Sequence, residues 1–179
     1  MTLRTSHRFA WRLLLLLGGA CLAGSPAFAQ SPNPAPAPAT ATIQVSGEVT
    51  TPLSLTVEAL GKLKKSELTA KDRDGKEHRY TGVAFVDLLR AAGVTLGPAL
   101  RGENLAKYVL VEAADGYQAV FALPELDPEF AREVALVAYQ ADGKPLPAGE
   151  GPFRLVVPAD KKHARWVREV AAIKVLFAE

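Results

Sequence analysis

The chain has 179 residues, of which 49% are hydrophobic, and its 21 basic and 19 acidic residues give a formal net charge of +2. This length allows one domain with a substantial core, and the near balance of charge gives no general argument for nucleic-acid binding. One cysteine and three histidines exclude a disulfide framework and leave few ligands for a transition-metal site.

Residues 1–29 have the features of an export signal. Three arginines stand near the start without any acidic residue, residues 13–17 are all leucine, and residues 27–29 (AFA) match the small-x-small cleavage pattern. The apolar run is shorter than the roughly 20 residues that a membrane span needs. We therefore expect cleavage before Gln30 and a periplasmic or secreted protein.

Two alternatives to this reading are an uncleaved anchor and a lipid anchor at Cys21. The lipid anchor is disfavoured because Gly18 stands where a lipidation motif normally has a large aliphatic residue. No two arginines are adjacent, so we expect a Sec-type signal and passage through the membrane as an unfolded chain. Cleavage removes the only cysteine and three basic residues, which leaves 18 basic and 19 acidic residues and two histidines, His78 and His163.

Residues 30–42 are predicted to be a linker. Proline alternates with small residues from Pro32 to Pro38, which favours an extended chain that cannot build a core. The segment is either a spacer that holds the domain away from a membrane or a disordered N-terminal tail. The domain is then expected over residues 43–179.

Within the domain, short segments of strand and helix character alternate with glycine-containing turns. Asp-Gly pairs at 74–75 and 115–116 predict hairpins, and a third pair at 142–143 predicts another turn. Thr56 is placed to cap a short helix. In chain order we expect a strand over 43–49 broken at Gly47, an extended piece over 52–55, a helix over 56–63, strands over 67–73 and 77–80, an amphipathic helix between Gly82 and Gly93, strands over 108–111 and 117–121, a helical turn over 126–130, and strands over 134–139, 153–157 and 170–176.

These elements are mixed without a regular strand–helix alternation, which predicts an α+β fold rather than a doubly wound parallel sheet. The sequence has no internal repeat, no glycine-rich phosphate loop and no serine–histidine pair in a nucleophile motif, so no catalytic residue is predicted. Glu125, Asp127 and Glu129 form a carboxylate cluster, but their position around Pro128 is typical of the solvated start of a helix.

Several segments of the domain occur in a characteristic order and spacing. They are 45–49 (VSGEV) with Pro52 and 55–60, 82–89 (GVAFVDLL), 115–117 (DGY), 135–139 (ALVAY), 142–147 (DGKPLP), 151–158 (GPFRLVVP) and 165–167 (RWV). Together they resemble the molybdopterin-binding domain of the sulfite oxidase family, including its exported bacterial members, from about residue 43 to 176. The resemblance implies mixed sheets with short helices, oxidoreductase activity and molybdopterin as the cofactor.

The chain departs from this family at the metal. Family enzymes place a cysteine, whose thiolate binds molybdenum, soon after the strand that here is residues 68–71, and this chain has Ala70 and Lys71 there and no sulfur. Hard ligands do not stabilise a high-valent oxo-metal centre as a soft thiolate does. The family often has a histidine before its Gly-Pro-x-Arg segment, where this chain has Glu150, and the domain lacks insertions that help to cover a pterin.

The resemblance implies two groups of residues for binding the cofactor or another anion. Arg154 matches a strand arginine whose planar fork suits phosphate or carboxylate, and the alternative is a structural arginine paired with a carboxylate. A basic loop lies near the pterin phosphate in the family, and the alternative is a solvated charge run. The members of this loop are Lys161, Lys162, His163 and Arg165.

Asp115 and Tyr117 stand where the family has residues at the mouth of the pocket. The alternative is turn chemistry for Asp115 and a core aromatic for Tyr117. Trp166 is expected in the core. No metal site is predicted, because cleavage removes the cysteine and the histidines His78 and His163 are far apart in sequence.

Three functions are compatible with these observations. The missing thiolate favours an exported, non-redox module that binds an anionic small molecule or an envelope protein. The alternatives are a molybdopterin-dependent oxidoreductase with an atypical metal ligand and an accessory subunit of an envelope complex. The sequence leaves the cofactor undetermined, and we expect neither nucleic-acid binding nor a transmembrane helix after signal cleavage.

Overall fold

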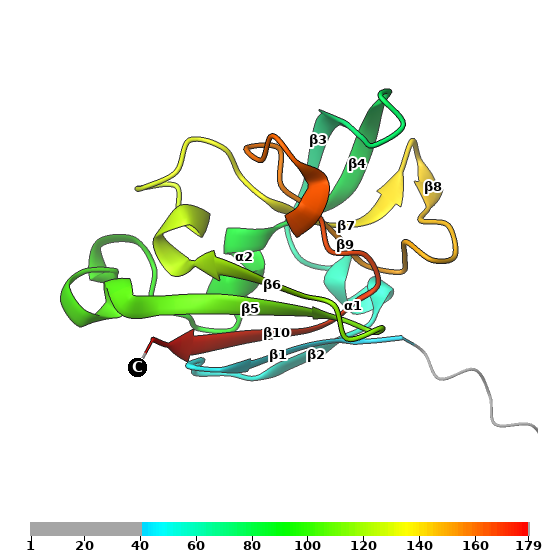
Figure 1. The fold of residues 1–179 in the computed structure, drawn as a ribbon. Coiled ribbons are helices and arrows are strands. Elements are labelled where there is room, and N and C mark those ends of the chain that lie inside the picture. The colour runs from blue at the N-terminus through cyan, green and yellow to red at the C-terminus, as the bar shows by residue number, and fades with distance from the viewer. Residues whose placement is uncertain (1–40, 179) are drawn as a thin grey trace, which may run out of the picture. The chain divides into compact units, whose positions relative to one another are not determined.

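The computed structural model describes residues 41–178, so the predicted export signal and most of the predicted linker lie outside the described residues. Two sheets and several short helices build the domain (Figure 1), which confirms the predicted α+β class. The elements are β1 Ile43–Gly47, β2 Leu53–Leu55, α1 Val57–Leu60, β3 Lys65–Lys71, β4 Glu77–Ala84, α2 Phe85–Ala91, the 3-10 helices η1 Gly97–Ala99 and η2 Gly102–Ala106, β5 Lys107–Ala113, β6 Gln118–Ala122, η3 Leu123–Leu126, β7 Leu136–Ala141, β8 Lys144–Pro145, β9 Arg154–Val156, η4 His163–Arg165 and β10 Val170–Phe177.

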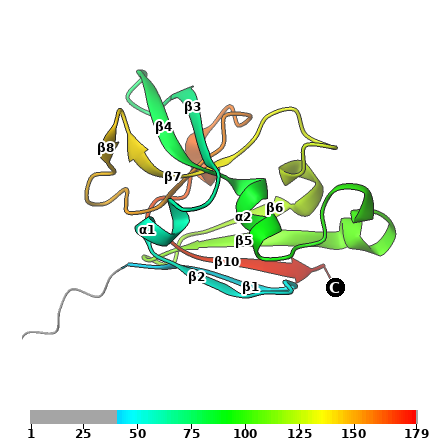
Figure 2. The ribbon, with the colours of Figure 1, turned by 180° about the vertical axis from the view of Figure 1, so that it is seen from behind.

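The first sheet has the strand order β2-β1-β10-β5-β6. Its strands β1 and β10, the first and last of the domain, run parallel, with Val45 opposite Ile173, and its other pairs are antiparallel. Figure 2 shows β1 and β2 at one side of this sheet, beyond β10. Every second residue of β5 and β6 is buried, so one face of the sheet packs on the core.

The second sheet has the order β3-β4-β7-β8, and β9 pairs with the same edge of β7 as β8 does. β3 and β4 form the hairpin that the pair Asp74-Gly75 predicts. β4 contacts β7 closely at Gly82, where a Cβ atom would lie 2.1 Å from the carbonyl oxygen of Val137. Only glycine fits this approach, which brings β4 to the start of α2.

The core lies between the sheets, and α2 contributes to it (Figure 1). Phe85 of α2 packs edge-to-face on Phe121 of β6 with ring centroids 6.3 Å apart. Leu88, Leu89 and Ala92 are fully buried on the same side of the helix, which confirms the amphipathic pattern. At the N-terminus of α1, the Thr56 hydroxyl accepts the N–H of Ala59 at 3.2 Å, as a cap should.

One detail differs from the sequence predictions. A turn follows η3 as expected, with the N–H of Ala131 donating to the carbonyl of Asp127 at 2.9 Å, but the carboxylate of Asp127 is not solvated: the residue is only 2% exposed. It accepts the N–H groups of Gly97 at 2.6 Å and Glu129 at 2.9 Å, so it fastens two loops together. Within residues 41–178 no helix is long and apolar enough to cross a membrane.

Candidate functional site

Arg154, the predicted strand arginine, is buried in β9 and is only 2% exposed. Its guanidinium donates to Asp72 through two nitrogens at 2.8 and 2.9 Å and to Glu150 at 2.7 Å. The two carboxylates therefore neutralise the arginine inside the protein. This is the arrangement of a structural arginine, and binding of an external anion by Arg154 stays a prediction.

The aromatic rings of Tyr80 and Trp166 enclose this ion pair. Each ring centroid lies 5.5 Å from the guanidinium carbon of Arg154, and the two rings meet edge-to-face at 6.1 Å. Trp166 is buried, as expected, and its indole N–H donates to the carbonyl of Val157 at 2.8 Å. The rings cover the guanidinium, whereas the side chains of Asp72 and Glu150 remain 13% and 34% exposed.

Asp72 is the centre of this cluster. It accepts the hydroxyl of Tyr80 at 2.6 Å and the N–H of Arg73 at 2.7 Å, besides the two bonds from Arg154. Burial opposes ionisation of this carboxyl, but the hydrogen bonds outweigh burial and hold the pKa of Asp72 well below its usual range. Burial and the bond to Asp72 raise the pKa of Tyr80, so the phenol keeps its proton as the donor.

Sequence reasoning missed Asp72, Glu150 and Tyr80 as partners of Arg154. Asp72 and Tyr80 are 82 and 74 residues from Arg154 in the chain, so no local pattern connects them. Glu150 carried a usable signal, because it stands four residues before Arg154 at the position where the family often has a histidine.

The basic loop makes contacts of two kinds. Arg165 donates to both carboxylate oxygens of Asp160, at 2.9 and 2.7 Å, and to Glu125 at 2.9 Å, so its charge is neutralised within the domain. His163 places Nε2 2.8 Å from the carbonyl oxygen of Lys71 and stacks edge-to-face on Trp166. Lys161 and Lys162 are exposed, and anion binding by this loop stays a prediction.

Asp115 and Tyr117 lie at the β5–β6 turn. The carboxylate of Asp115 accepts the N–H of Tyr117 at 2.9 Å, which is turn chemistry. Tyr117 is 49% exposed, so it is not the core aromatic that the alternative reading expected. Its hydroxyl donates to the carbonyl of Ala164 at 2.7 Å and so connects the turn to the basic loop.

The structure brings some of the predicted site residues together and separates others. Asp115 and Tyr117 line a hollow of about 230 Å³ together with Ala164 and Trp166, but none of the four basic-loop residues lines it. Arg154 lines a different hollow of about 600 Å³, together with Asp72 and Glu150. Arg154 and the basic loop therefore do not share one cavity.

These residues do not fit the molybdopterin that the resemblance implies. The hollow of about 230 Å³ beside Tyr117 is below the about 300–1,000 Å³ typical of pockets that enclose ligands of cofactor size. The hollow of about 600 Å³ at Arg154 is large enough, but its arginine is already paired with Asp72 and Glu150. At the end of β3, where the family has its cysteine, the chain has Ala70, Lys71 and Asp72, and the carboxylate of Asp72 is already bound to Arg154. In the part of the chain that the structure describes, no three His, Cys, Asp or Glu side chains are arranged to hold a metal ion.

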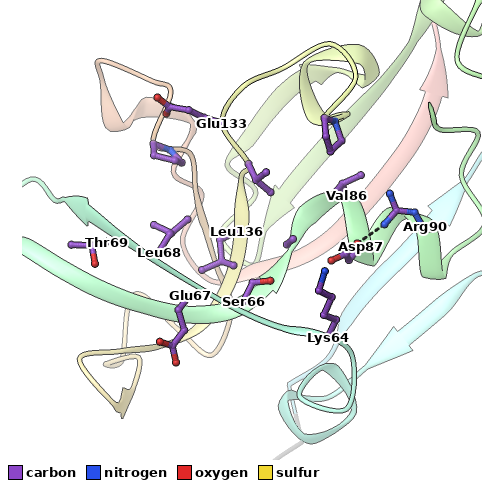
Figure 3. A pocket seen from close by; sticks show the side chains of 14 residues that line it. Lys64, Ser66, Glu67, Leu68, Thr69, Val86, Asp87, Arg90, Glu133 and Leu136 are labelled. Carbon is purple, nitrogen blue, oxygen red and sulfur yellow. Dashed lines mark hydrogen bonds and ion pairs between the residues drawn. The ribbon is translucent and has the colours of Figure 1, made fainter. Parts of the chain in front are cut away.

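A larger pocket lies elsewhere, beside β3, and has a volume of about 760 Å³ (Figure 3). Its floor includes Leu68 and Leu136, and charged side chains surround it. It shares no lining residue with the hollow next to Tyr117.

Comparison with known structures gives the same fold. The chain matches the sulfane dehydrogenase SoxCD from Paracoccus pantotrophus with a TM-score of 0.59 and 22% sequence identity, over 76% of this chain and 38% of that one. The chain thus spans less than half the length of this structural neighbour. Comparison with curated protein sequences gave no match.

The family model described as "Oxidoreductase molybdopterin binding domain" matches residues 30–179. That range includes every strand of both sheets and every residue that the sequence resemblance selected. By this match and by its fold, the chain belongs to the oxidoreductase molybdopterin-binding domain family.

Proposed function

We propose that the chain is an exported, non-redox member of this family that works as a binding module. The observation that carries the proposal is the pairing of the buried Arg154 with the carboxylates of Asp72 and Glu150. In this cluster the strand arginine of the family forms an internal ion pair. The end of β3 next to it has no sulfur ligand for a metal. A fold can keep its architecture while its site changes, so membership of the family does not require redox chemistry.

The proposal is tested by measuring molybdenum and pterin in protein purified from the cell envelope of its source. We expect molybdenum far below one atom per chain by elemental mass spectrometry, and no pterin fluorescence after oxidation. A family member that has the cysteine, purified in the same way, provides the positive control. Molybdenum and pterin near one per chain would overturn the proposal in favour of an oxidoreductase with an atypical metal ligand.

Export is the second part of the proposal and has its own test. The positive start, apolar run and AFA motif of residues 1–29 support it. Intact mass of the protein from the extracytoplasmic fraction is expected to correspond to a chain that begins at Gln30. A full-length mass, or a lipid-modified chain that begins at Cys21, would contradict cleavage at this site.

A further inference from the structure

Strand β3 has one unpaired edge. It is the end strand of its sheet and pairs only with β4. The N–H of Asp72 donates to the carbonyl of Lys76, its opposite residue in the hairpin. In an antiparallel pair every second residue bonds the neighbouring strand, so the backbone groups that point toward β4 are those of Asp72, Ala70, Leu68 and Ser66. The residues between them therefore direct their N–H and C=O groups away from the sheet. They are Lys65, Glu67, Thr69 and Lys71.

Most of these outward groups have no partner in residues 41–178. The carbonyl of Lys71 accepts the ring of His163, but the outward N–H and C=O groups of Lys65, Glu67 and Thr69 bond to no other part of the described chain. Three residues with both groups free form a row that an extended peptide can pair with.

A groove with both apolar and polar lining residues borders this edge on the inner side of the sheet. The 760 Å³ pocket of Figure 3 is lined by Leu68 of β3, Val86 of α2, Leu136 of β7 and Val134 of the preceding loop. Side chains of a strand alternate between its two faces, so a peptide strand added to β3 would place every second side chain in this groove. The backbone edge and the pocket thus fit the same occupant.

The charges around the groove indicate which peptide fits. Asp87 pairs with Arg90, whereas Lys64 and Glu133 have no ion-pair partner among the described residues and lie on opposite sides of the pocket (Figure 3). A second copy of β3 fits poorly, because the strand has Lys65 and Lys71 at its two ends and an antiparallel pair would bring like charges together.

We propose that the β3 groove is a docking site for an extended segment of another protein, which adds a strand to the second sheet. The segment has apolar residues at alternate positions, a carboxylate toward Lys64 and a basic side chain toward Glu133. This inference rests on the proposed function in naming the partner of the binding module. The groove shares no lining residue with the hollow at Arg154, on which the proposed function rests, so the two proposals can fail separately.

The test uses the mature chain, Gln30–Glu179, immobilised against a phage library of random 12-residue peptides. Enriched peptides are synthesised and titrated by fluorescence anisotropy into wild type, Thr69→Pro and Thr69→Ala. Proline removes the outward N–H of Thr69 and leaves the ladder to β4 intact, while alanine removes only the side chain. We expect alternating apolar residues in the peptides and at least tenfold weaker binding to Thr69→Pro than to Thr69→Ala, which lacks the same side chain but keeps the N–H.

A second readout leaves the protein unchanged, in case Thr69→Pro does not fold. The peptide is N-methylated at alternate residues, in two versions that block one or the other of its backbone edges. One version is expected to bind at least tenfold more weakly and the other to bind like the parent. Hydrogen exchange at the amides of Lys65, Glu67 and Thr69 should slow on binding, while exchange in β6, an edge strand of the other sheet, should not change.

Three results would overturn the docking site: no peptide enriched above background, enriched peptides that are indifferent to both Thr69→Pro and N-methylation, or peptides without the alternating pattern. Molybdenum and pterin in the native protein would overturn the proposed function and leave the peptide result standing. If the native protein contains neither molybdenum nor pterin and the phage selection enriches no peptide, the domain is cofactor-free and binds no peptide at β3.

Discussion

At the scale of the residue, the guanidinium of Arg154 is a buried charge held by two carboxylates. Its two terminal nitrogens meet carboxylates, while Nε has no hydrogen-bond partner in the described residues. A buried charge with incomplete hydrogen bonding is tolerable only while its counter-charges stay in place. The stability of the domain should therefore depend on Asp72 more than on other carboxylates.

We expect Asp72→Asn to lower the free energy of unfolding by about 3 kcal/mol, because it leaves the buried guanidinium with one carboxylate instead of two. Chemical denaturation at neutral pH measures this loss. The control Glu103→Gln changes an exposed carboxylate and should stay within about 0.5 kcal/mol of wild type. Equal stability of Asp72→Asn and wild type would show that the ion pair contributes nothing net.

At the scale of the element, one histidine connects two hairpins. His78 of β4 places Nδ1 2.7 Å from the carboxylate of Asp142, in the β7–β8 turn, and Nε2 3.2 Å from that of Asp74, in the β3–β4 turn. Asp142 also accepts the N–H of Arg79 at 2.9 Å. Hydrogen bonds to Asp142 and then Asp74 raise the pKa of His78 above 6.5, although burial opposes this slightly.

This contact should make the stability of the domain depend on pH. Because the pKa of His78 is higher in the folded state, its contribution is complete below about pH 6.5 and is lost as the pH rises through the folded value. Asp74 and Asp142 have lowered pKa values, so their contribution is lost on acidification. The contact of His78 with Asp74 and Asp142 therefore stabilises the domain most in weakly acidic solution.

We expect the difference in melting temperature between wild type and His78→Gln to be largest near pH 5–6 and to shrink toward pH 9. Calorimetry or circular dichroism over this range measures it, and Lys76→Gln, which changes an exposed residue of the same turn, serves as control. A difference that grows between pH 6 and 9 would contradict the assigned direction of the shift.

At the scale of the whole molecule, the first sheet depends on both ends of the domain, because β10 lies between β1 and β5. Removing β10 would leave the facing edges of β1 and β5 without hydrogen-bond partners. It would also remove Ile173 and Val175, which are fully buried, and so expose the core around them. The predicted domain begins near Ile43, and the sequence predicts a signal and a linker before this residue.

We expect a chain that ends at Glu169 to lack a cooperative unfolding transition, since the loss of β10 removes the centre of the first sheet. A chain that begins at Ala41 should keep a melting temperature within a few degrees of the mature protein. Circular dichroism measures both. Cooperative melting of the shorter C-terminal truncation, or collapse of the N-terminal one, would contradict this division of the chain.

Local features of the fold were predictable from sequence, and long-range ones were not. The hairpin at Asp74-Gly75 and the helix of Phe85 follow from turn chemistry and periodicity, which act over a few residues. The pairing of Asp72 with Arg154 joins positions 82 residues apart. Likewise Asp127 looked solvated because its neighbours are polar, while the backbone of Gly97, 30 residues away, is what buries it. The family resemblance supplied the fold, but it could not show how the site is filled.

The parallel pairing of β1 with β10 has a consequence for the order in which the protein folds. The two strands are separated by more than 120 residues, so the loop between them must close before either gains the partner that it has in the native sheet. During synthesis β10 emerges after every other strand of the two sheets, and the first sheet stays incomplete until then. Such late completion prolongs the unfolded state, which is the state in which the proposed export would carry the chain across a membrane.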